Sequence, residues 1–335
     1  MKRIIPLLLL VIILCGCSVT STYSGSFFAM DTYMTITVCG NNPEKAVKKA
    51  EARVKKLDEA FSAHNKKSGV YKLNKNGSAE LEPDAVELLS LALNNYRITD
   101  GAFNPAMLSV TELWGFPDKN YKVPSENEIK SAHKNVKPEK ITVKNNTVKL
   151  NNKGMKIDFG AIAKGYTSDK LIDTLKKEGI KSALVNLGGN VAVLGGKPDG
   201  SDWAVAVENP DKKGSYLATL KIRDKSVITS GGYERYFKKN GKVYHHILNP
   251  KTGHPAESSL KSVTIVGKNG TYCDALSTAL FVMGKEKALR FWAENGLDFD
   301  VILYTENGGL FVTEGVSDII NSDFDYKVVK RSDYE

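Results

Sequence analysis

Residues 31–61 read DTYMTITVCGNNPEKAVKKAEARVKKLDEAF, a strand pattern followed at once by a helix pattern. The first part, 31–38, partly alternates polar and apolar residues and is rich in β-branched side chains, which is typical of a strand. Asn42, Pro43 and Glu44 then supply a cap, a first-turn proline and an early acid. The apolar residues that follow are spaced by three and four, so they predict one buried helix stripe ending near residue 61. These residues are Val47, Ala50, Val54, Leu57 and Phe61.

The rest of the chain mixes helix and strand patterns without a regular βαβ alternation. Further helices are expected from residue 83 and over 163–177. Two hairpins are expected at 141–150 and 301–313, where strand patterns flank short polar turns. Additional strands are expected at 183–187, 203–207, 216–222 and 263–266. This order favours the α+β class over a doubly wound α/β fold. Because no repeat or Pro/Ser-rich linker divides the chain, we expect one continuous domain over 27–330.

The first residues predict export. Met1-Lys2-Arg3 supplies a positive start, and the apolar run 4–14 is too short to span a bilayer, so it is typical of a secretory signal. The sequence Leu14-Cys15-Gly16-Cys17 resembles a bacterial lipobox. That resemblance implies cleavage after residue 16, a lipid on Cys17, a tether over 17–26, and a place on the outer face of a bacterial cell membrane. A plain signal peptide remains the alternative.

Composition excludes several classes of protein. Hydrophobic residues are 41% and charged residues 25% of the 335, which excludes wholesale disorder, a collagen-like repeat and a polytopic membrane protein. The net charge is +9, and loss of the signal with Lys2 and Arg3 lowers it to +7. Such a charge suits an anionic ligand, an anionic membrane surface or nucleic acid, and export removes nucleic acid as a partner. Cys39 and Cys273 would remain as the two thiols of the mature chain, free to pair or not.

The familiar nucleotide, hydrolase and zinc motifs are missing. No G-x-G-x-x-G follows a strand, and no Walker A sequence or G-x-S-x-G elbow occurs. No C-x-x-C or H-E-x-x-H pair predicts a zinc site. The chemistry must therefore come from less common arrangements.

Residues 156–166, KIDFGAIAKGY, place an acid before small residues and a lysine at the start of a helix. Small residues let the backbone approach a ligand, and the amides of a helix start, together with Lys164, can hold phosphate. A strand-to-helix turn capped by Asp158 is the structural alternative.

A second polar group lies at Asp274, Ser277 and Thr278, which stand at i, i+3 and i+4 and therefore share one helix face. A carboxylate and a hydroxyl there can hold Mg²⁺, a cation that takes oxygen ligands. A capping aspartate with a back-bonded threonine is the alternative.

A third group surrounds His246, between residues 229–237 and the turn 249–253. An unshifted histidine titrates near neutral pH, so His246 can act as a general base or clamp a ligand. A core histidine is the alternative. The glycine turn 186–190 (NLGGN) carries little information alone.

Taken together and in order, these segments resemble the ApbE family, the FAD:protein FMN transferases, over about residues 28–313. The resemblance rests on 29–32 (AMDT), 101–105 (GAFNP) with 114–116 (WGF), and 158–166, and it continues through 186–189, 229–237, 246–253 and 274–284. It implies a T-fold-like arrangement of mixed sheets and helices with an FAD cleft between lobes. It also implies Mg²⁺-dependent transfer of FMN from FAD to a Ser or Thr hydroxyl, with release of AMP. The acceptors would be flavoprotein subunits of membrane redox complexes.

The resemblance also assigns residues. The positions that would contact FAD are Met30, His64, Ala102, Phe103, Asn104, Asp158, Lys164 and Leu248. The metal ligands would be the Ala161 carbonyl, Asp274 and Thr278. His246 is our own candidate for the base, from the chemistry of histidine. His64 stands where the family often has Tyr, and Ser277 stands where several members have Asp, so one carboxylate fewer is present for a second metal. FAD hydrolysis to FMN and AMP, and flavin binding without chemistry, are the alternatives.

Overall fold

The computed structural model describes residues 21–334, so the predicted signal peptide and Cys17 lie outside the described residues. The first element, β1 (Ser21–Ala29), pairs antiparallel along its whole length with β2 (Thr32–Gly40). Residues 21–26, expected to belong to the tether, therefore belong to the sheet. The physical reason is the facing hydroxyls: Ser24 Oγ lies 2.7 Å from Thr37 Oγ1, so the polar strand is matched by its neighbour.

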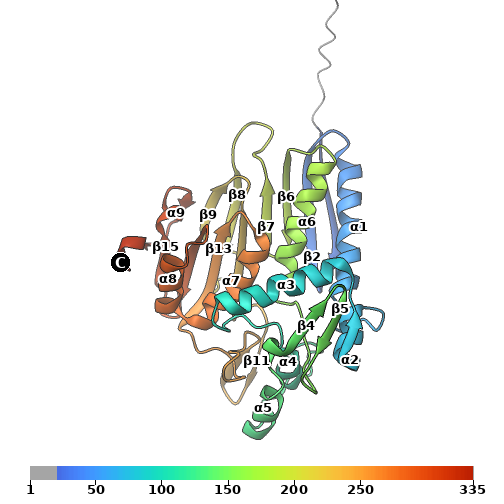
Figure 1. Cartoon of the computed structure of the whole chain (residues 1–335). Helices are drawn as coiled ribbons and strands as arrows, with labels where there is room; N and C mark the ends of the chain where they lie inside the picture. The colour runs from blue at the N-terminus through green and yellow to red at the C-terminus, as the bar shows by residue number, and fades with distance from the viewer. Residues whose placement is uncertain (1–20, 335) are drawn as a thin grey trace, which may run out of the picture.

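A nine-stranded sheet, called the main sheet below, organises the molecule (Figure 1). Neighbouring strands are antiparallel except β15 and β17, which are parallel. The order is β1, β2, β6 (Ser182–Leu187), β7 (Asn190–Leu194), β10 (Ser226–Gly231), β13 (Leu260–Gly267), β14 (Phe299–Thr305), β15 (Leu310–Thr313) and β17 (Tyr326–Val329). The α+β prediction is confirmed.

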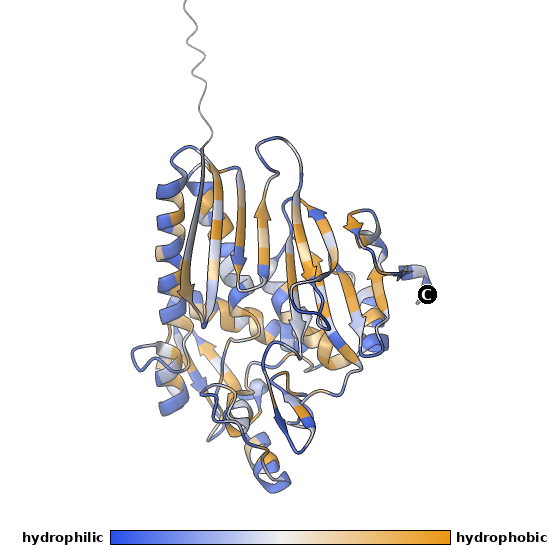
Figure 2. Cartoon of the chain, turned by 180° about the vertical axis from the view of Figure 1, so that it is seen from behind, coloured by the Kyte–Doolittle hydropathy of each residue, from blue (hydrophilic) through white to orange (hydrophobic). Residues whose placement is uncertain are grey.

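Helices cover one face of the main sheet. One half is covered by α1 (Pro43–Phe61) and α6 (Ala163–Lys177), and the other by α7 (Gly270–Met283) and α8 (Lys285–Glu294). The opposite face, seen from behind in Figure 2, is covered in part by the small sheet β8 (Trp203–Glu208), β9 (Tyr216–Ile222) and β16 (Ile320–Asn321). The sheet is thus buried by different partners on its two faces.

A group of smaller elements, called the lower lobe below, lies under the main sheet in Figure 1. Between the two lies α3 (Pro83–Ile98). The lobe's helices are α2 (Gly69–Asn76), α4 (Leu108–Trp114) and α5 (Glu126–His133), and its strands are β3 (Ser78–Glu80), β4 (Ile141–Lys144), β5 (Thr147–Leu150), β11 (Tyr236–Lys239) and β12 (Lys242–His245). Short elements complete the chain: η1 (Pro138–Lys140), α9 (Glu314–Ser317) and η2 (Arg331–Asp333).

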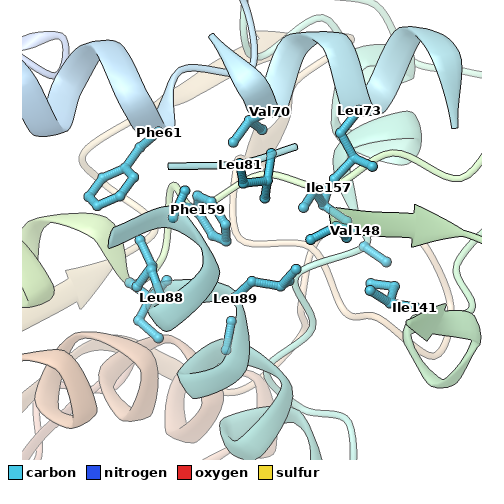
Figure 3. Close-up of a cluster of buried hydrophobic side chains, with 14 of the residues drawn as sticks. Phe61, Val70, Leu73, Leu81, Leu88, Leu89, Ile141, Val148, Ile157 and Phe159 are labelled. Carbon is cyan, nitrogen blue, oxygen red and sulfur yellow. The ribbon is translucent and has the colours of Figure 1, made fainter. Parts of the chain in front are cut away.

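A core of aromatic and aliphatic side chains joins the lower lobe to the helices (Figure 3). It contains Phe61 from the end of α1, Leu88 and Leu89 from α3, and Ile157 and Phe159 from the segment before α6. Phe61 contacts Phe159 edge to face, with ring centroids 5.8 Å apart. The core therefore fixes the segment that carries Asp158.

Local signals were accurate at some helix ends and wrong at others. The first helix ends at Phe61 as expected, but Asn42 has a left-handed φ of 51° and makes no side-chain cap. The helix α5 was not expected in a polar stretch, although Ser125 and Glu128 form a capping box there. Cys39 and Cys273 are both buried and unpaired. Within residues 21–334, no helix has the length and apolar character needed to cross a membrane.

Candidate functional site

The candidate site is built where the starts of α6 and α7 meet. The Gly165 amide, in the first turn of α6, donates a hydrogen bond of 2.8 Å to Asp274 Oδ2 on α7. A Cβ atom on Gly165 would lie 2.1 Å from the Gly270 carbonyl oxygen and 2.6 Å from Asp274 Cβ. Only glycine permits this approach of the two helices. The contact therefore places Asp274 at the amino end of α6.

The other carboxylate oxygen of Asp274 is also held. Asn190, the first residue of β7, donates from Nδ2 to Asp274 Oδ1 at 2.9 Å, and both side chains are buried. Burial raises the pKa of Asp274, while the Lys164 charge and the Gly165 and Asn190 hydrogen bonds act against this rise. A buried carboxylate with a fixed donor on each oxygen has one orientation and still keeps lone pairs for a cation.

A row of hydroxyls lies beside Asp274. Ser230 Oγ, on β10, lies 2.8 Å from Ser277 Oγ and 3.2 Å from Thr278 Oγ1. Ser277 Oγ also donates to the Asp274 carbonyl at 2.8 Å. The prediction that Asp274, Ser277 and Thr278 share one face of α7 is confirmed. Asp274 lies within α7, and Asn269 is the N-cap of that helix, so Asp274 does not cap its own helix.

The bond from Gly165 to Asp274 also leaves the Ala161 carbonyl without its usual helical hydrogen bond. In a regular helix the Gly165 amide would bond to the residue four positions earlier, but here it bonds to Asp274. Within residues 21–334 no hydrogen bond reaches the Ala161 carbonyl oxygen. Ala161 itself is partly exposed. Its carbonyl can therefore serve a ligand.

The predicted metal ligands are all oxygen atoms, the kind of donor that Mg²⁺ takes. The part of the chain that the structure describes holds no group of three or more His, Cys, Asp or Glu side chains suited to a metal. Mg²⁺ often takes only one or two protein carboxylates and completes its shell with water and substrate phosphates. Asp274 supplies one such carboxylate, and its sharing a Mg²⁺ ion with Thr278 and the Ala161 carbonyl stays a prediction.

His246 enters the site from the end of β12. Its Nδ1 lies 3.1 Å from the Arg235 carbonyl, so Nδ1 carries the proton and Nε2 keeps its lone pair. Burial lowers the pKa of His246 to about 4, and the charges of Arg235 and Lys164 act in the same direction. The expectation of an unshifted histidine is therefore wrong, because the ring is desolvated beside two cations. His246 is neutral near pH 7 and can accept a proton at Nε2.

Asp158 is held by backbone and by α2. Its amide donates to the Pro105 carbonyl at 3.1 Å, and its Oδ1 accepts from the Gly160 amide at 2.8 Å. Asn74 of α2 bonds both the amide and the carbonyl of Ile157, at 2.7 and 2.8 Å. Burial raises the pKa of Asp158, opposed by the Gly160 amide and the nearby His64. The rigid turn leaves Asp158 Oδ2 without a protein donor among residues 21–334.

Met30 lies in the tight turn between β1 and β2. Met30 and Asp31 have φ of 48° and 59°, the left-handed pair of a two-residue hairpin that glycine and asparagine usually occupy. The Met30 amide donates to Asp58 Oδ2 at 3.2 Å, and the buried Thr167 hydroxyl lies 3.8 Å from Met30 Sδ. The strained turn therefore presents Met30 next to the first turns of α6.

Four other predicted FAD residues lie in packed or structural positions. Ala102 and Phe103 are buried in the core drawn in part in Figure 3, and Leu248 is buried beside Trp114. Asn104 Oδ1 accepts from the Ala106 amide at 2.9 Å. Contacts from these residues to FAD stay predictions, as does the predicted contact from the exposed His64.

Sequence patterns predicted no role for two residues that fix Asp274 and the start of α7. Asn190 is the last residue of the glycine turn 186–190, and nothing local indicates that its amide reaches a carboxylate 84 positions away. Asp169 of α6 accepts from the Gly270 and Thr271 amides, both at 2.8 Å, and so caps the start of α7. Asp169 also lines a polar surface hollow of about 410 Å³ together with Lys170.

Comparison with known proteins identifies one family. The model of the ApbE family matches residues 30–303. An FAD:protein FMN transferase of Treponema pallidum is 34% identical over 308 residues, covering 83% of this chain and 85% of that protein. One of Haemophilus influenzae is 31% identical over 286 residues, covering 82% of each. The crystal structure of the ApbE protein of Thermotoga maritima superposes with a TM-score of 0.83 at 33% identity, covering 89% of this chain and 99% of that one.

Proposed function

The chain belongs to the ApbE family, and from this membership and its site we propose that it is a FAD:protein FMN transferase. The observation that carries the proposal is the doubly held Asp274 at the amino end of α6, beside Lys164. The positive charge of Lys164 favours a diphosphate, and the fixed carboxylate favours the cation that accompanies it.

The reaction we propose is a phosphoryl transfer. The oxygen of an acceptor Ser or Thr forms a bond to the phosphorus on the FMN side of FAD, and the bond from that phosphorus to the AMP oxygen breaks. FMN becomes a phosphoester of the acceptor, AMP leaves, and the hydroxyl proton passes to a base. Such transfers depend on positioning and on neutralised charge more than on covalent help from the protein.

The described residues divide these tasks. His246 accepts the hydroxyl proton at Nε2, because Nδ1–H is committed to the Arg235 carbonyl. Lys164 places positive charge at the diphosphate, Met30 contacts the flavin portion of FAD, and Asp158 is a further FAD contact. Mg²⁺, held by Asp274, Thr278 and the Ala161 carbonyl, would supply further neutralisation of phosphate charge.

Transfer and hydrolysis are separated by one assay. The full chain is mixed with FAD, Mg²⁺ and a candidate acceptor, and AMP and flavin fluorescence of the acceptor on a denaturing gel are measured. We expect AMP together with a fluorescent acceptor. AMP without labelling would show that the protein is an FAD pyrophosphatase and not a transferase. If neither AMP nor labelling is detected, the protein binds flavin without chemistry.

We further propose that the protein works at the outer face of a bacterial cell membrane, anchored through a lipid on Cys17. The support is the lipobox-like sequence at Leu14–Cys17. Acceptors there would be subunits of membrane redox complexes. Cys17→Ala should move the protein from the membrane fraction to the soluble fraction, whereas unchanged membrane retention would refute the anchor.

A further inference from the structure

The chain enters the main sheet at the end farthest from Met30. Ser21, the first residue of β1, pairs with Gly40 at the end of β2, whereas Met30 follows the other end of β1. Nine residues of extended strand span about 30 Å, so Ser21 and Met30 lie about that far apart. In Figure 1 this upper end of the sheet also holds the start of α1 and the end of α6, opposite the lower lobe.

Lysines of α1 lie beside the start of β1. A surface hollow of about 870 Å³ is lined by Ser21 and Tyr23 of β1 together with Lys45, Lys48 and Lys49. These three lysines belong to the first two turns of α1 and are exposed. The first residue of the sheet and three ammonium groups therefore border the same hollow.

The end of α6 adds three more lysines at this place. Lys49 Nζ of α1 lies 2.7 Å from Glu178 Oε1, directly after α6, so the two helix ends are in contact. Lys176 and Lys177 in the last turn of α6, and Lys181 before β6, are exposed. Residues 21–23, 40–49 and 176–182 are together called the upper corner below.

Positive charge is concentrated in the upper corner. It contains six lysines and two glutamates, a net +4 out of the +7 of the chain without its signal. The neighbouring loops at the same end of the sheet, 195–202, 223–225, 268–269 and 296–298, contain four basic and four acidic side chains. The positive charge is therefore greatest beside the point where β1 begins.

Acidic neighbours leave this charge largely in place. Glu44 pairs with Lys48 and Glu178 pairs with Lys49, while the other four lysines have no ion-pair partner among residues 21–334. Asp173, one helical turn before Lys177 on α6, lowers the local charge by one at most. Complementarity therefore favours an anionic partner for the upper corner.

The position of Cys17 indicates which anion this partner is. Four residues of chain reach at most about 14 Å, so a lipid on Cys17 holds Ser21 within about that distance of the lipid headgroups. Attraction between lysines and anionic headgroups acts over about 10 Å at ordinary salt concentrations. The corner that an anchored chain brings to the membrane is thus the corner that carries the positive charge.

We propose that the upper corner docks on an anionic phospholipid surface. This inference rests on the proposed lipid anchor, because the anchor decides which end of the main sheet lies near the membrane. Lysines from α1 and α6 contact the phosphate groups, and the strands of the main sheet rise from the surface. Met30 is then held about 30 Å farther from the lipid than Ser21, which sets the height at which an acceptor must present its hydroxyl.

Chemical labelling of lysines on the purified lipidated protein tests the proposal. The protein is reconstituted on vesicles of phosphatidylcholine alone or mixed with phosphatidylglycerol, and acetylation of each lysine is measured by mass spectrometry. We expect Lys48, Lys177 and Lys181 to be labelled at least about threefold more slowly on the anionic vesicles, and added NaCl to remove the difference. Lys144 and Lys149 of the β4–β5 hairpin should be labelled equally on both. Equal labelling of the upper corner on the two kinds of vesicle would overturn the proposal.

Two charge-reversed variants locate the docking surface. The upper-corner variant carries Lys45→Glu, Lys177→Glu and Lys181→Glu. The control variant carries the same change at three exposed lysines at and beside the β4–β5 hairpin: Lys140→Glu, Lys144→Glu and Lys149→Glu. Protection of Lys48 on anionic vesicles should disappear in the upper-corner variant and persist in the control. Loss of protection in both variants, or in neither, would overturn the proposal.

Separate readouts keep the anchor and the docking surface apart. The mass of the N-terminal peptide reports whether Cys17 carries a lipid. If it carries a lipid and the upper corner is not protected, the docking proposal fails alone. If it carries none, the anchor fails, and the unlipidated chain should still sediment with anionic vesicles and not with neutral ones. Absence of the chain from the anionic vesicles would then overturn the docking proposal as well.

Discussion

Asp169 of α6 and Asp274 of α7 each accept amide hydrogen bonds from the start of the other helix. Asp169 of α6 accepts the first amides of α7, at Gly270 and Thr271, while Asp274 of α7 accepts the Gly165 amide at the start of α6. Burial raises the pKa of both carboxyls, and hydrogen bonds oppose the rise in both. Each aspartate is therefore a helix cap supplied by the partner helix.

What differs is how many donors each carboxylate receives. Asp169 has three, since the Thr271 hydroxyl adds a bond of 2.6 Å to the two amides, and all come from one helix start. Asp274 has one donor on each oxygen, from Gly165 and Asn190, and a row of hydroxyls beside it. Asp169, with more hydrogen-bond donors, is suited to stabilising the helix contact. Asp274, with fewer donors, keeps lone pairs that a ligand can use.

The largest expected effect comes from Asp274→Asn. The side chain keeps its shape, and the Asn190 amide can turn to present its oxygen, so the fold should persist. Transfer of FMN should fall about a hundred- to thousand-fold, because the negative charge that a cation needs is gone. Flavin labelling of the acceptor measures the rate, and circular dichroism checks the fold. Mg²⁺-dependent labelling at the parental rate would remove Asp274 from the metal site.

The next largest effect is expected from Gly165→Ala, which disrupts the close contact between the first turns of α6 and α7, called the helix crossing below. The new Cβ would lie 2.1 Å from the Gly270 carbonyl oxygen, so α6 and α7 must separate. We expect a loss of about 2–3 kcal/mol in the free energy of unfolding and a fall in transfer rate of about tenfold or more. Chemical denaturation and labelling kinetics measure the two.

Gly179→Ala provides the control at the other end of α6. Its φ of 78° makes alanine strained, but no atom lies within 4 Å of the new Cβ. A loss of about 1 kcal/mol without a change in rate is expected there. If Gly165→Ala and Gly179→Ala lower the transfer rate equally, the contact between α6 and α7 does not position the catalytic residues.

Asp169→Asn is expected to affect stability more than rate. The substitution keeps an acceptor for one amide but turns an NH₂ group toward another donor. The free energy of unfolding should fall by about 1–2 kcal/mol, the range for a lost helix cap. The labelling rate at a temperature well below Tm should stay within a few-fold of the parent. A hundred-fold loss of rate with an unchanged Tm would show that Asp169 belongs to the chemistry.

The contrast also shows what the sequence could and could not predict. The i, i+3, i+4 spacing of Asp274, Ser277 and Thr278 is a local property of one helix, and it was predicted correctly. The bond from Gly165 to Asp274 joins residues 109 positions apart and depends on two glycines passing each other. In the sequence, Gly165 belongs to a small-residue segment that suggested approach to a ligand and not to another helix, and Gly270 carries no local signal. The shifted pKa of His246 was missed for the same reason, because desolvation comes from elements distant in the chain.

The smallest effect is expected from pH, and it separates His246 from an ordinary histidine. His246 must be neutral to accept a proton, and its pKa of about 4 keeps it neutral down to about pH 5. The value of kcat/KM for FAD, which reports the free enzyme, should therefore change less than twofold between pH 5.5 and 7.5. A histidine with a pKa of 6.5 would lose about tenfold over that range. His246→Gln should lower the rate at every pH without moving the acid limb into this window. A tenfold fall in the parent between pH 7.5 and 5.5 that disappears in His246→Gln would show that His246 titrates normally, and that its burial does not set its protonation state in the working enzyme.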